Sequence, residues 1–218
     1  MGMAVIFDMD GTMVDNMMVH HRAWQKVLKD LGLNMSIEEV RKEIHGVNHQ
    51  ILDRLFPDRF NKTEQSKICS EKELQYRKLF KSDLKLIDGL EDFLLKLKNA
   101  RVPLGIGSAA PPENLDFVLD NLAIRGFFKS IRHSEDVKLG KPNPEIYLKV
   151  ANDLERKPKE CLVFEDTPTG AEAAYNARCE LIVITTTHPK HEFSHIPNIS
   201  RFIHDYKKME LDDLGIKI

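Results

Sequence analysis

The chain has 218 residues, of which 42% are hydrophobic and 30% charged, and its 32 basic and 34 acidic side chains leave a formal charge of −2. Nothing in this balance indicates a polyanion-binding protein, and no nucleic-acid partner is expected. No run approaches the roughly 18 apolar residues of a membrane span, so no membrane partner is expected. Three cysteines without a C-x-x-C spacing and the lack of a signal-peptide pattern predict reduced thiols and a cytoplasmic location.

Short apolar runs of β type recur along the chain, and most are uninterrupted rather than alternating. Such runs are typical of strands that are covered on both faces. Helical patterns separate the later runs, and this alternation predicts a parallel, doubly wound α/β sheet. The predicted strands are Ala4–Phe7, Val102–Gly107, Ser130–His133, Cys161–Phe164, Leu181–Thr185 and Arg201–Ile203, and the predicted helices are Leu90–Ala100, Pro112–Leu122, Asn143–Leu154 and Thr169–Ala177.

Between the first two predicted strands the alternation stops and the pattern is helical throughout. Apolar side chains from Met17 to Leu31 fall on one face of a first helix, and Ser36 with Glu39 forms a capping box that begins a second. We therefore predict an all-helical domain that is inserted into the α/β core and joined to it by two chain crossings, which is the layout of a hinged cap. The predicted boundaries are 1–13 and 87–218 for the core and 14–86 for the helical cap.

Polar and charged residues gather at predicted strand ends or in the loops just beyond them. Ligands of doubly wound sheets bind beyond the carboxyl ends of the strands. Asp8 and Asp10 follow the first strand with one residue between them, and carboxylates beside an apolar core are costly unless a cation meets them or chemistry needs them. The four groups are Asp8–Thr12, Gly107–Ala109, Lys141–Pro142 and Glu165–Asp166.

Each group also has a simpler interpretation. An aspartate at a strand end can cap a turn, a Lys-Pro pair can be a solvated loop, and Glu165 with Asp166 can begin a helix. Taken together, these interpretations require four coincidences at one end of one sheet. We therefore favour a single shared site.

The segments FDMDGT, IGSAAPPEN, GKPNPEIY and VFEDTPTGAEAA resemble, in the correct order, the four motifs of the haloacid dehalogenase superfamily of phosphotransferases. The resemblance covers nearly the whole core, and the helical insert matches the cap position of the first subfamily. It implies that Asp8 attacks phosphorus and forms an aspartyl-phosphate, and that Asp10 acts as general acid and then as base. Ser108 would donate a hydrogen bond to the phosphoryl group, and Lys141 would screen the charge of the transition state.

The same resemblance implies Mg²⁺ as the cofactor. Asp8, the backbone carbonyl of Asp10 and Asp166 would bind the ion, and Glu165 would support it through water or other residues, or bind it directly. Mg²⁺ prefers hard oxygen ligands and keeps several waters, so the ion would explain why carboxylates cluster here. Gly11 permits the tight turn in which backbone N–H groups point at phosphate oxygens.

Within the superfamily, the chain most resembles the β-phosphoglucomutase-like phosphatases. MVDNMMVHHRAW resembles their hinge and first cap helix, with His20 and Trp24 in matching positions, and HGVNHQIL resembles their specificity loop. Lys72 lies where that group has a cap lysine that reaches the substrate. Ala109 and Asn114, in and after the second motif, are further candidates for substrate contact. The candidates for substrate selection on the cap are His45, Asn48, His49, Lys72 and Arg77.

Two departures favour a phosphatase over a mutase. Mutases of this group hold a second phosphate with a cap arginine and a Ser-Lys-Asn run after the second motif, whereas this chain has His49 and Ala110–Pro112 there, with Asn114 as a partial substitute. A neutral imidazole cannot replace a bidentate guanidinium. We therefore predict a monomeric, Mg²⁺-dependent phosphatase for a small phosphorylated metabolite such as a sugar phosphate, with β-phosphoglucomutase as the alternative. A dehalogenase is disfavoured because its leaving group has no oxygen for Asp10 to protonate, and a phospho-receiver module needs neither Asp10 nor a cap.

Three further positions carry local expectations. Asp15 is expected to cap the first cap helix. Arg178 lies where the family ends a helix with glycine, and a left-handed arginine there would cost roughly 1 kcal/mol. The run HPKHEFSH from His188 to His195 contains a proline and lacks apolar periodicity, so it is expected to be a loop and not a metal site.

Overall fold

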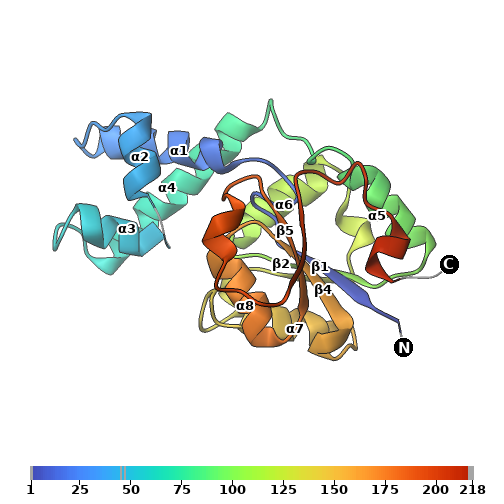
Figure 1. Ribbon diagram of the computed structural model, residues 1–218. Coiled ribbons are helices and arrows are strands. Elements are labelled where there is room, and N and C mark those ends of the chain that lie inside the picture. Colours follow the sequence, from blue (N-terminus) through green and yellow to red (C-terminus); the bar gives the residue numbers. More distant parts are fainter. Residues whose placement is uncertain (1, 45, 47, 216–218) are drawn as a thin grey trace. The chain divides into compact units, whose positions relative to one another are not determined.

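The computed structural model describes residues 2–44, 46 and 48–215 (Figure 1). It divides into two compact units, one of Met1–Asp15 with Lys85–Ile218 and one of Asn16–Leu84. Both crossings lie two residues inside the predicted helical insert, so residues 14–15 and 85–86 belong to the α/β unit. The cause is local bonding: Gly11 N donates to Val14 O at 2.8 Å, and Ile87 N donates to Met13 O at 2.9 Å.

The α/β unit contains a six-stranded sheet in the order β3-β2-β1-β4-β5-β6, and every neighbouring pair is parallel. The chain builds the sheet outward from β1 in one direction and then in the other, so the strand order reverses beside β1. This confirms the predicted doubly wound α/β fold. The strands are β1 Ala4–Phe7, β2 Leu104–Gly107, β3 Ser130–Arg132, β4 Cys161–Glu165, β5 Glu180–Ile184 and β6 Ile199–Ile203.

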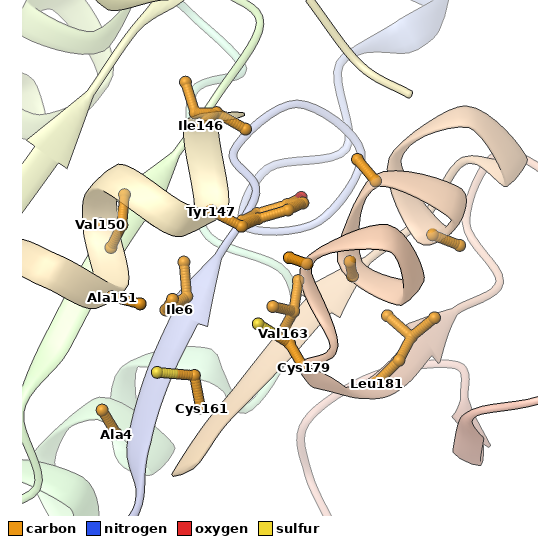
Figure 2. Packing of buried hydrophobic residues seen from close by; sticks show 14 of the residues in the cluster. Ala4, Ile6, Ile146, Tyr147, Val150, Ala151, Cys161, Val163, Cys179 and Leu181 are labelled. Atoms are coloured by element: carbon orange, nitrogen blue, oxygen red, sulfur yellow. The ribbon is translucent and has the colours of Figure 1, made fainter. Parts of the chain in front are cut away.

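Helices cover both faces of this sheet. Helices α7 and α8 contact each other and the strands of one face (Figure 1), and Figure 2 shows Ile6 and Val163 packed there with Tyr147. On the other face, the rings of Phe7 and Phe164 stack at 5.0 Å, and Phe93 of α5 meets the ring of Phe164. The helices of this unit are α5 Leu90–Asn99, α6 Pro112–Asn121, α7 Glu145–Asp153 and α8 Pro168–Ala177, and its short 3-10 helices are Arg125–Phe127, Ser134–Asp136, Pro158–Glu160, Lys190–Phe193 and Leu211–Leu214.

The helical unit has an apolar core of its own, to which Trp24, Leu28 and Leu52 belong. The predicted capping box is present, because Ser36 accepts from Glu39 N and Glu39 accepts from Ser36 N. No helix within the described residues is long and apolar enough to cross a membrane. The helices of this unit are α1 Met17–Asp30, α2 Ile37–Glu43, α3 Asn48–Leu55 and α4 Lys62–Phe80.

Helix α1 begins differently from the prediction. Its N-cap position is occupied by Asn16, and no side chain caps the helix there. Asp15 is exposed and belongs to the other unit, so the predicted capping role of Asp15 is wrong. The Asn16 side chain instead turns inward and donates to the Tyr76 hydroxyl at 2.6 Å.

Arg178 ends α8 in the left-handed conformation, with φ 64° and ψ 33°, so the turn keeps the form that glycine would favour. We expect Arg178→Gly to raise the free energy of unfolding by about 0.5–1 kcal/mol, because relief of the left-handed strain exceeds the extra entropy of the unfolded chain. Urea unfolding of the full chain measures the change. Glu172→Gly within the same helix is the matched control and should lower stability by a similar amount. A loss of stability in Arg178→Gly would contradict the strain argument.

Candidate active site

The sheet brings three of the four sequence motifs together at its carboxyl edge. Phe7, the last residue of β1, lies opposite Ile106 of β2 and Phe164 of β4. The residues that follow these strands therefore start side by side, and Asp8 N donates to Phe164 O at 3.0 Å. Ser108, directly after β2, is 1% exposed. The strand order reverses between β1 and β4, which is where ligands of such sheets bind.

A tight turn after β1 sets the position of Asp10 and Gly11. Met13 N donates to Met9 O at 2.8 Å, and Gly11 adopts φ 75°. A Cβ atom at Gly11 would lie 2.0 Å from Oδ2 of Asp166, so both the backbone conformation and the space require glycine here. This turn places the β1 motif directly against Asp166.

Lys141 joins the two sides of the site. Its Nζ donates to Oδ1 of Asp8 at 2.6 Å and to Oε1 of Glu165 at 2.7 Å, and the side chains of Lys141 and Asp8 are each 8% exposed. The ammonium also lies 4.9 Å from the centre of the Tyr147 ring. The predicted proximity of Lys141 to Asp8 is present in the structure.

Glu165 is held by hydrogen-bond donors on both carboxylate oxygens. Oε1 accepts from Lys141 and from the Tyr147 hydroxyl, the latter at 2.9 Å. Oε2 accepts from the backbone N of Asp166 at 2.8 Å and from the backbone N and hydroxyl of Thr167 at 3.0 and 3.1 Å. A carboxylate offers about four lone-pair sites, so this geometry favours a support for Lys141 and the adjoining loop over direct metal binding.

The start of α8 makes room for that carboxylate. Thr167 caps the helix by accepting from Gly170 N at 3.0 Å. A Cβ atom at Gly170 would lie 1.6 Å from Oε1 of Glu165. A side chain at Gly170 would therefore displace Glu165 and, through it, Lys141.

Burial and unbalanced charge dominate the electrostatics of the site. Burial raises the pKa of Asp8 to about 8, although Lys141 acts to lower it. Burial, with the charges of Glu165 and Asp8, raises the pKa of Asp166 well above its usual range. Burial also acts to raise the pKa of Glu165, but the Lys141 ammonium holds it below its usual range. Asp8 and Glu165 contact the Lys141 ammonium, and Asp166 lies near both carboxyl groups, so the cluster lacks positive charge.

The residues fit a divalent cation with oxygen ligands. Within the described part of the chain, no group of three or more His, Cys, Asp or Glu side chains forms a metal-binding cluster. Asp8, Asp166 and the backbone carbonyl of Asp10 stay the predicted ligands, and the donors on both oxygens of Glu165 favour support over direct binding by that carboxylate. Hard carboxylate and carbonyl oxygens, and the deficit of positive charge, suit Mg²⁺ with several bound waters.

The other predicted residues of the α/β unit occupy different environments. Asp10 is half-buried in the turn after β1, Ala109 is exposed beside Ser108, and Ser108 Oγ accepts from Ala110 N at 3.1 Å. Asn114 lies in the first turn of α6 with no exposed surface. A catalytic role for Asp10 and Ser108 and a substrate contact by Ala109 or Asn114 stay predictions.

In the helical unit, Lys72 is at the centre of a buried polar network. Its Nζ lies 2.9 Å from Nδ1 of His20 and donates to Oε1 of Glu73 at 2.9 Å, while Asn48 donates to Glu73 at 2.8 Å. The ring of His20 stacks on Tyr76 at 3.9 Å. The network therefore ties α1, the start of α3 and α4 together around one ammonium.

The remaining residues predicted for substrate contact on the cap differ in exposure. Trp24 is 1% exposed and lies in the apolar core of the helical unit, with Lys72 Nζ 5.9 Å from its ring centre. This position suits packing beneath Lys72 better than contact with a substrate. His49 is exposed in the first turn of α3. His45 lies outside the described residues.

Sequence reasoning missed three side chains that hold the site of the α/β unit and one that holds the Lys72 network of the helical unit. Thr12 donates to Oδ1 of Asp166 at 3.0 Å, and Tyr147 donates to Glu165. Both belong to quoted motif segments, so their position was a usable signal. Thr187 and Glu73 lie outside the motifs: Thr187 donates to Asp166, and Glu73 pairs with Lys72. The position of Thr187, two residues after the predicted strand Leu181–Thr185, was the only hint of its role.

Comparison with known proteins identifies relatives along most of the chain. The profile of the haloacid dehalogenase-like hydrolases matches residues 3–178. The phosphorylated carbohydrates phosphatase of Thermotoga maritima is 29% identical over 184 residues, which cover 82% of this chain and 83% of that protein. The β-phosphoglucomutase of Bacillus subtilis is 26% identical over 182 residues, which cover 80% of this chain and 79% of that protein.

The fold is shared with solved structures over nearly its full length. The crystal structure of a HAD hydrolase, family IA, variant 3, from Entamoeba histolytica has a TM-score of 0.89 and 28% sequence identity, and the match covers 98% of this chain and 97% of that chain. The similarity includes both the α/β unit and the helical insert, since the matched length spans both.

Proposed function

Because this chain belongs to the haloacid dehalogenase-like hydrolases, in the group that resembles β-phosphoglucomutase, we propose that it is a Mg²⁺-dependent phosphatase for a small phosphorylated metabolite of the sugar-phosphate type. The observation that carries the proposal is the pair of Asp8 and Lys141, joined at 2.6 Å and nearly buried at the switch point of the sheet. A carboxylate at a strand tip, beside a fixed ammonium, is the arrangement that phosphoryl transfer through an enzyme carboxylate needs.

In the proposed reaction, an oxygen of Asp8 forms a bond to phosphorus while the bond from phosphorus to the ester oxygen breaks. Asp10 gives its proton to that leaving oxygen, so the alcohol departs neutral. Asp10 then takes a proton from water, whose oxygen attacks the phosphorus of the aspartyl-phosphate. The bond from phosphorus to Asp8 breaks, inorganic phosphate leaves, and Asp8 is again a carboxylate.

Three groups of this chain would stabilise the phosphoryl group as it transfers. Lys141 carries a positive charge beside Asp8 and so favours the negative charge that gathers on the phosphoryl oxygens. Ser108 would donate a hydrogen bond from its hydroxyl. Backbone N–H groups of the turn at Met9–Gly11 would donate to further phosphoryl oxygens.

Asp8, the backbone carbonyl of Asp10 and Asp166 would hold the Mg²⁺ ion. When bound, Mg²⁺ supplies positive charge that offsets the repulsion between an anionic nucleophile and an anionic substrate. Glu165 holds Lys141 in place and keeps its charge directed at Asp8. Thr12 orients Asp166 through the hydrogen bond to Oδ1.

The substrate type is inferred from a relative, and the reaction type from residues of this chain. The relative from Thermotoga maritima is a phosphatase of phosphorylated carbohydrates. Hydrolysis, and not mutase chemistry, is favoured because His49 and Ala110–Pro112 replace the groups that would hold a second phosphate.

We further infer a monomer and, from the free thiols of Cys69, Cys161 and Cys179, a cytoplasmic location.

A substrate screen tests this function. The purified full chain is incubated with MgCl₂ and a panel of phosphorylated hexoses and pentoses, and free phosphate is measured, with EDTA in parallel samples. We expect phosphate release from at least one sugar phosphate, and its loss in EDTA. Interconversion of glucose 1-phosphate and glucose 6-phosphate without free phosphate would instead support the mutase.

A further inference from the structure

The chain leaves β5 through three consecutive threonines, and each hydroxyl has a different partner. Thr185 donates to the carbonyl of Ile203 at 3.1 Å. Thr186 donates to the carbonyl of Gly11. Thr187 contacts Asp166 twice, at the carbonyl at 2.8 Å and at carboxylate Oδ2 at 2.5 Å. Only the first of these bonds stays within the sheet edge, because the other two reach the loops that follow β1 and β4.

The contact between Thr187 and Asp166 involves a carboxylate without exposed surface. Thr12 donates to its Oδ1 at 3.0 Å, so each carboxylate oxygen receives one hydroxyl, from two loops on opposite sides of Asp166. A hydroxyl carries one hydrogen, and a bond to an ionised carboxylate, the form in which Asp166 would bind a metal, is about twice as strong as one to a neutral acceptor. The proton of Thr187 is therefore assigned to Oδ2.

Packing adds to the hydrogen bonds. A Cβ atom at Gly11 would meet Oδ2 of Asp166 and also Cγ2 of Thr187, the latter at 2.9 Å. Thr187 thus closes the space behind Gly11 on the side of Asp166, and Thr186 holds the carbonyl of Gly11. A rotation of the Asp166 carboxylate would have to displace one of these groups.

We propose that Thr187 is a positioning residue for metal binding: its hydroxyl fixes the Asp166 carboxylate in the orientation that accepts Mg²⁺. This rests on the proposed function, because it takes Asp166 as a ligand. It adds the loop after β5 to the groups that determine metal affinity. Groups that orient metal ligands typically contribute about 10- to 100-fold in affinity when they are removed.

Direct Mg²⁺ binding tests the proposal without any substrate. Isothermal titration of the purified full chain with MgCl₂ gives the dissociation constant of the parent, Thr187→Val and Thr187→Ser. We expect Thr187→Val to raise it about 10- to 100-fold, and Thr187→Ser to stay within about 3-fold of the parent because it keeps the hydroxyl. Thr185→Val is the matched control, since it removes a hydroxyl from the same segment without touching Asp166, and its affinity should equal that of the parent.

Thermal unfolding with and without MgCl₂ provides the second readout. The rise in Tm that the ion produces should shrink in Thr187→Val and persist in Thr187→Ser, whereas a merely structural effect would lower both Tm values and leave their difference unchanged. Equal Mg²⁺ affinity in Thr187→Val and the parent would overturn the role of Thr187, and so would equal weakening by the Val and Ser variants. A parent chain that binds no Mg²⁺ would instead overturn the proposed function itself.

Discussion

Asp8→Asn is expected to lower the rate of phosphate release by at least about 1,000-fold, which corresponds to about 4 kcal/mol. The amide matches the carboxylate in shape, so the site should keep its packing around Lys141. An amide oxygen is a far weaker nucleophile than a carboxylate oxygen, and the bond to phosphorus therefore does not form. Steady-state assay of phosphate release, on the sugar phosphate that the screen identifies, measures the effect.

The matched control is Asp15→Asn, which makes the same chemical change in the same stretch at an exposed position. We expect it to leave the rate unchanged. Acid quench of the parent during turnover, followed by peptide mass analysis, should add one phosphoryl group to the peptide that contains Asp8, and Asp8→Asn should show none. Phosphate release by Asp8→Asn at the parent rate would refute the mechanism.

The strands and the catalytic motifs were predictable from sequence because both depend on local pattern. Buried parallel strands have uninterrupted apolar runs, and β1 begins and ends as predicted at Ala4 and Phe7. Residues directly after such strands must gather at one edge of the sheet. The proximity of Asp8 and Lys141 was implied by the resemblance of their motifs to the family, although 133 positions separate them in the chain.

The contacts of the Glu165 side chain could not be predicted, because they depend on which hydrogen-bond donors reach its two carboxylate oxygens. Tyr147 reaches Oε1 from α7, and Gly170 leaves the space that the carboxylate fills. Both conditions arise from the packing of α7 and α8 on the sheet. An acidic residue beside Asp166 resembles a metal ligand in sequence, and only the contacts assign it to Lys141.

Contacts between distant helices limited the prediction in the helical unit. Lys72 lies in a polar, charged stretch of α4, yet it is 3% exposed. Its burial is tolerated because Glu73 supplies a counter-charge and His20 a ring nitrogen. His20 comes from α1, and no local periodicity indicates that its ring would lie beside Lys72. The predicted capping role of Asp15 was also wrong because of a contact outside the helix: the turn after β1 keeps Asp15 in the α/β unit.

Lys141→Met is expected to lower kcat/KM by about 100- to 1,000-fold, the range found when one group that stabilises developing charge is removed. Methionine fills similar space without the charge. The phosphoryl oxygens then lose a cation, and Asp8 loses the group that acts to lower its pKa. Because Asp8 attacks as a carboxylate, the acid limb of the pH profile of kcat/KM should move to higher pH. Lys138→Met, an exposed lysine of the same loop, is the control and should match the parent.

The stability of Lys141→Met should depend on pH with a definite sign. Lys141 acts to lower the pKa of both Asp8 and Glu165, so the variant raises both in the folded state, while the unfolded chain keeps values of about 4. The folded variant then holds protons that the unfolded chain has released, and its free energy of unfolding decreases as pH rises. Urea unfolding in EDTA should show a larger stability deficit relative to the parent at about pH 8 than at about pH 5. A deficit that is equal at both pH values would mean that Lys141 does not set the charge of these carboxyl groups, and its role beside Asp8 would have to be steric.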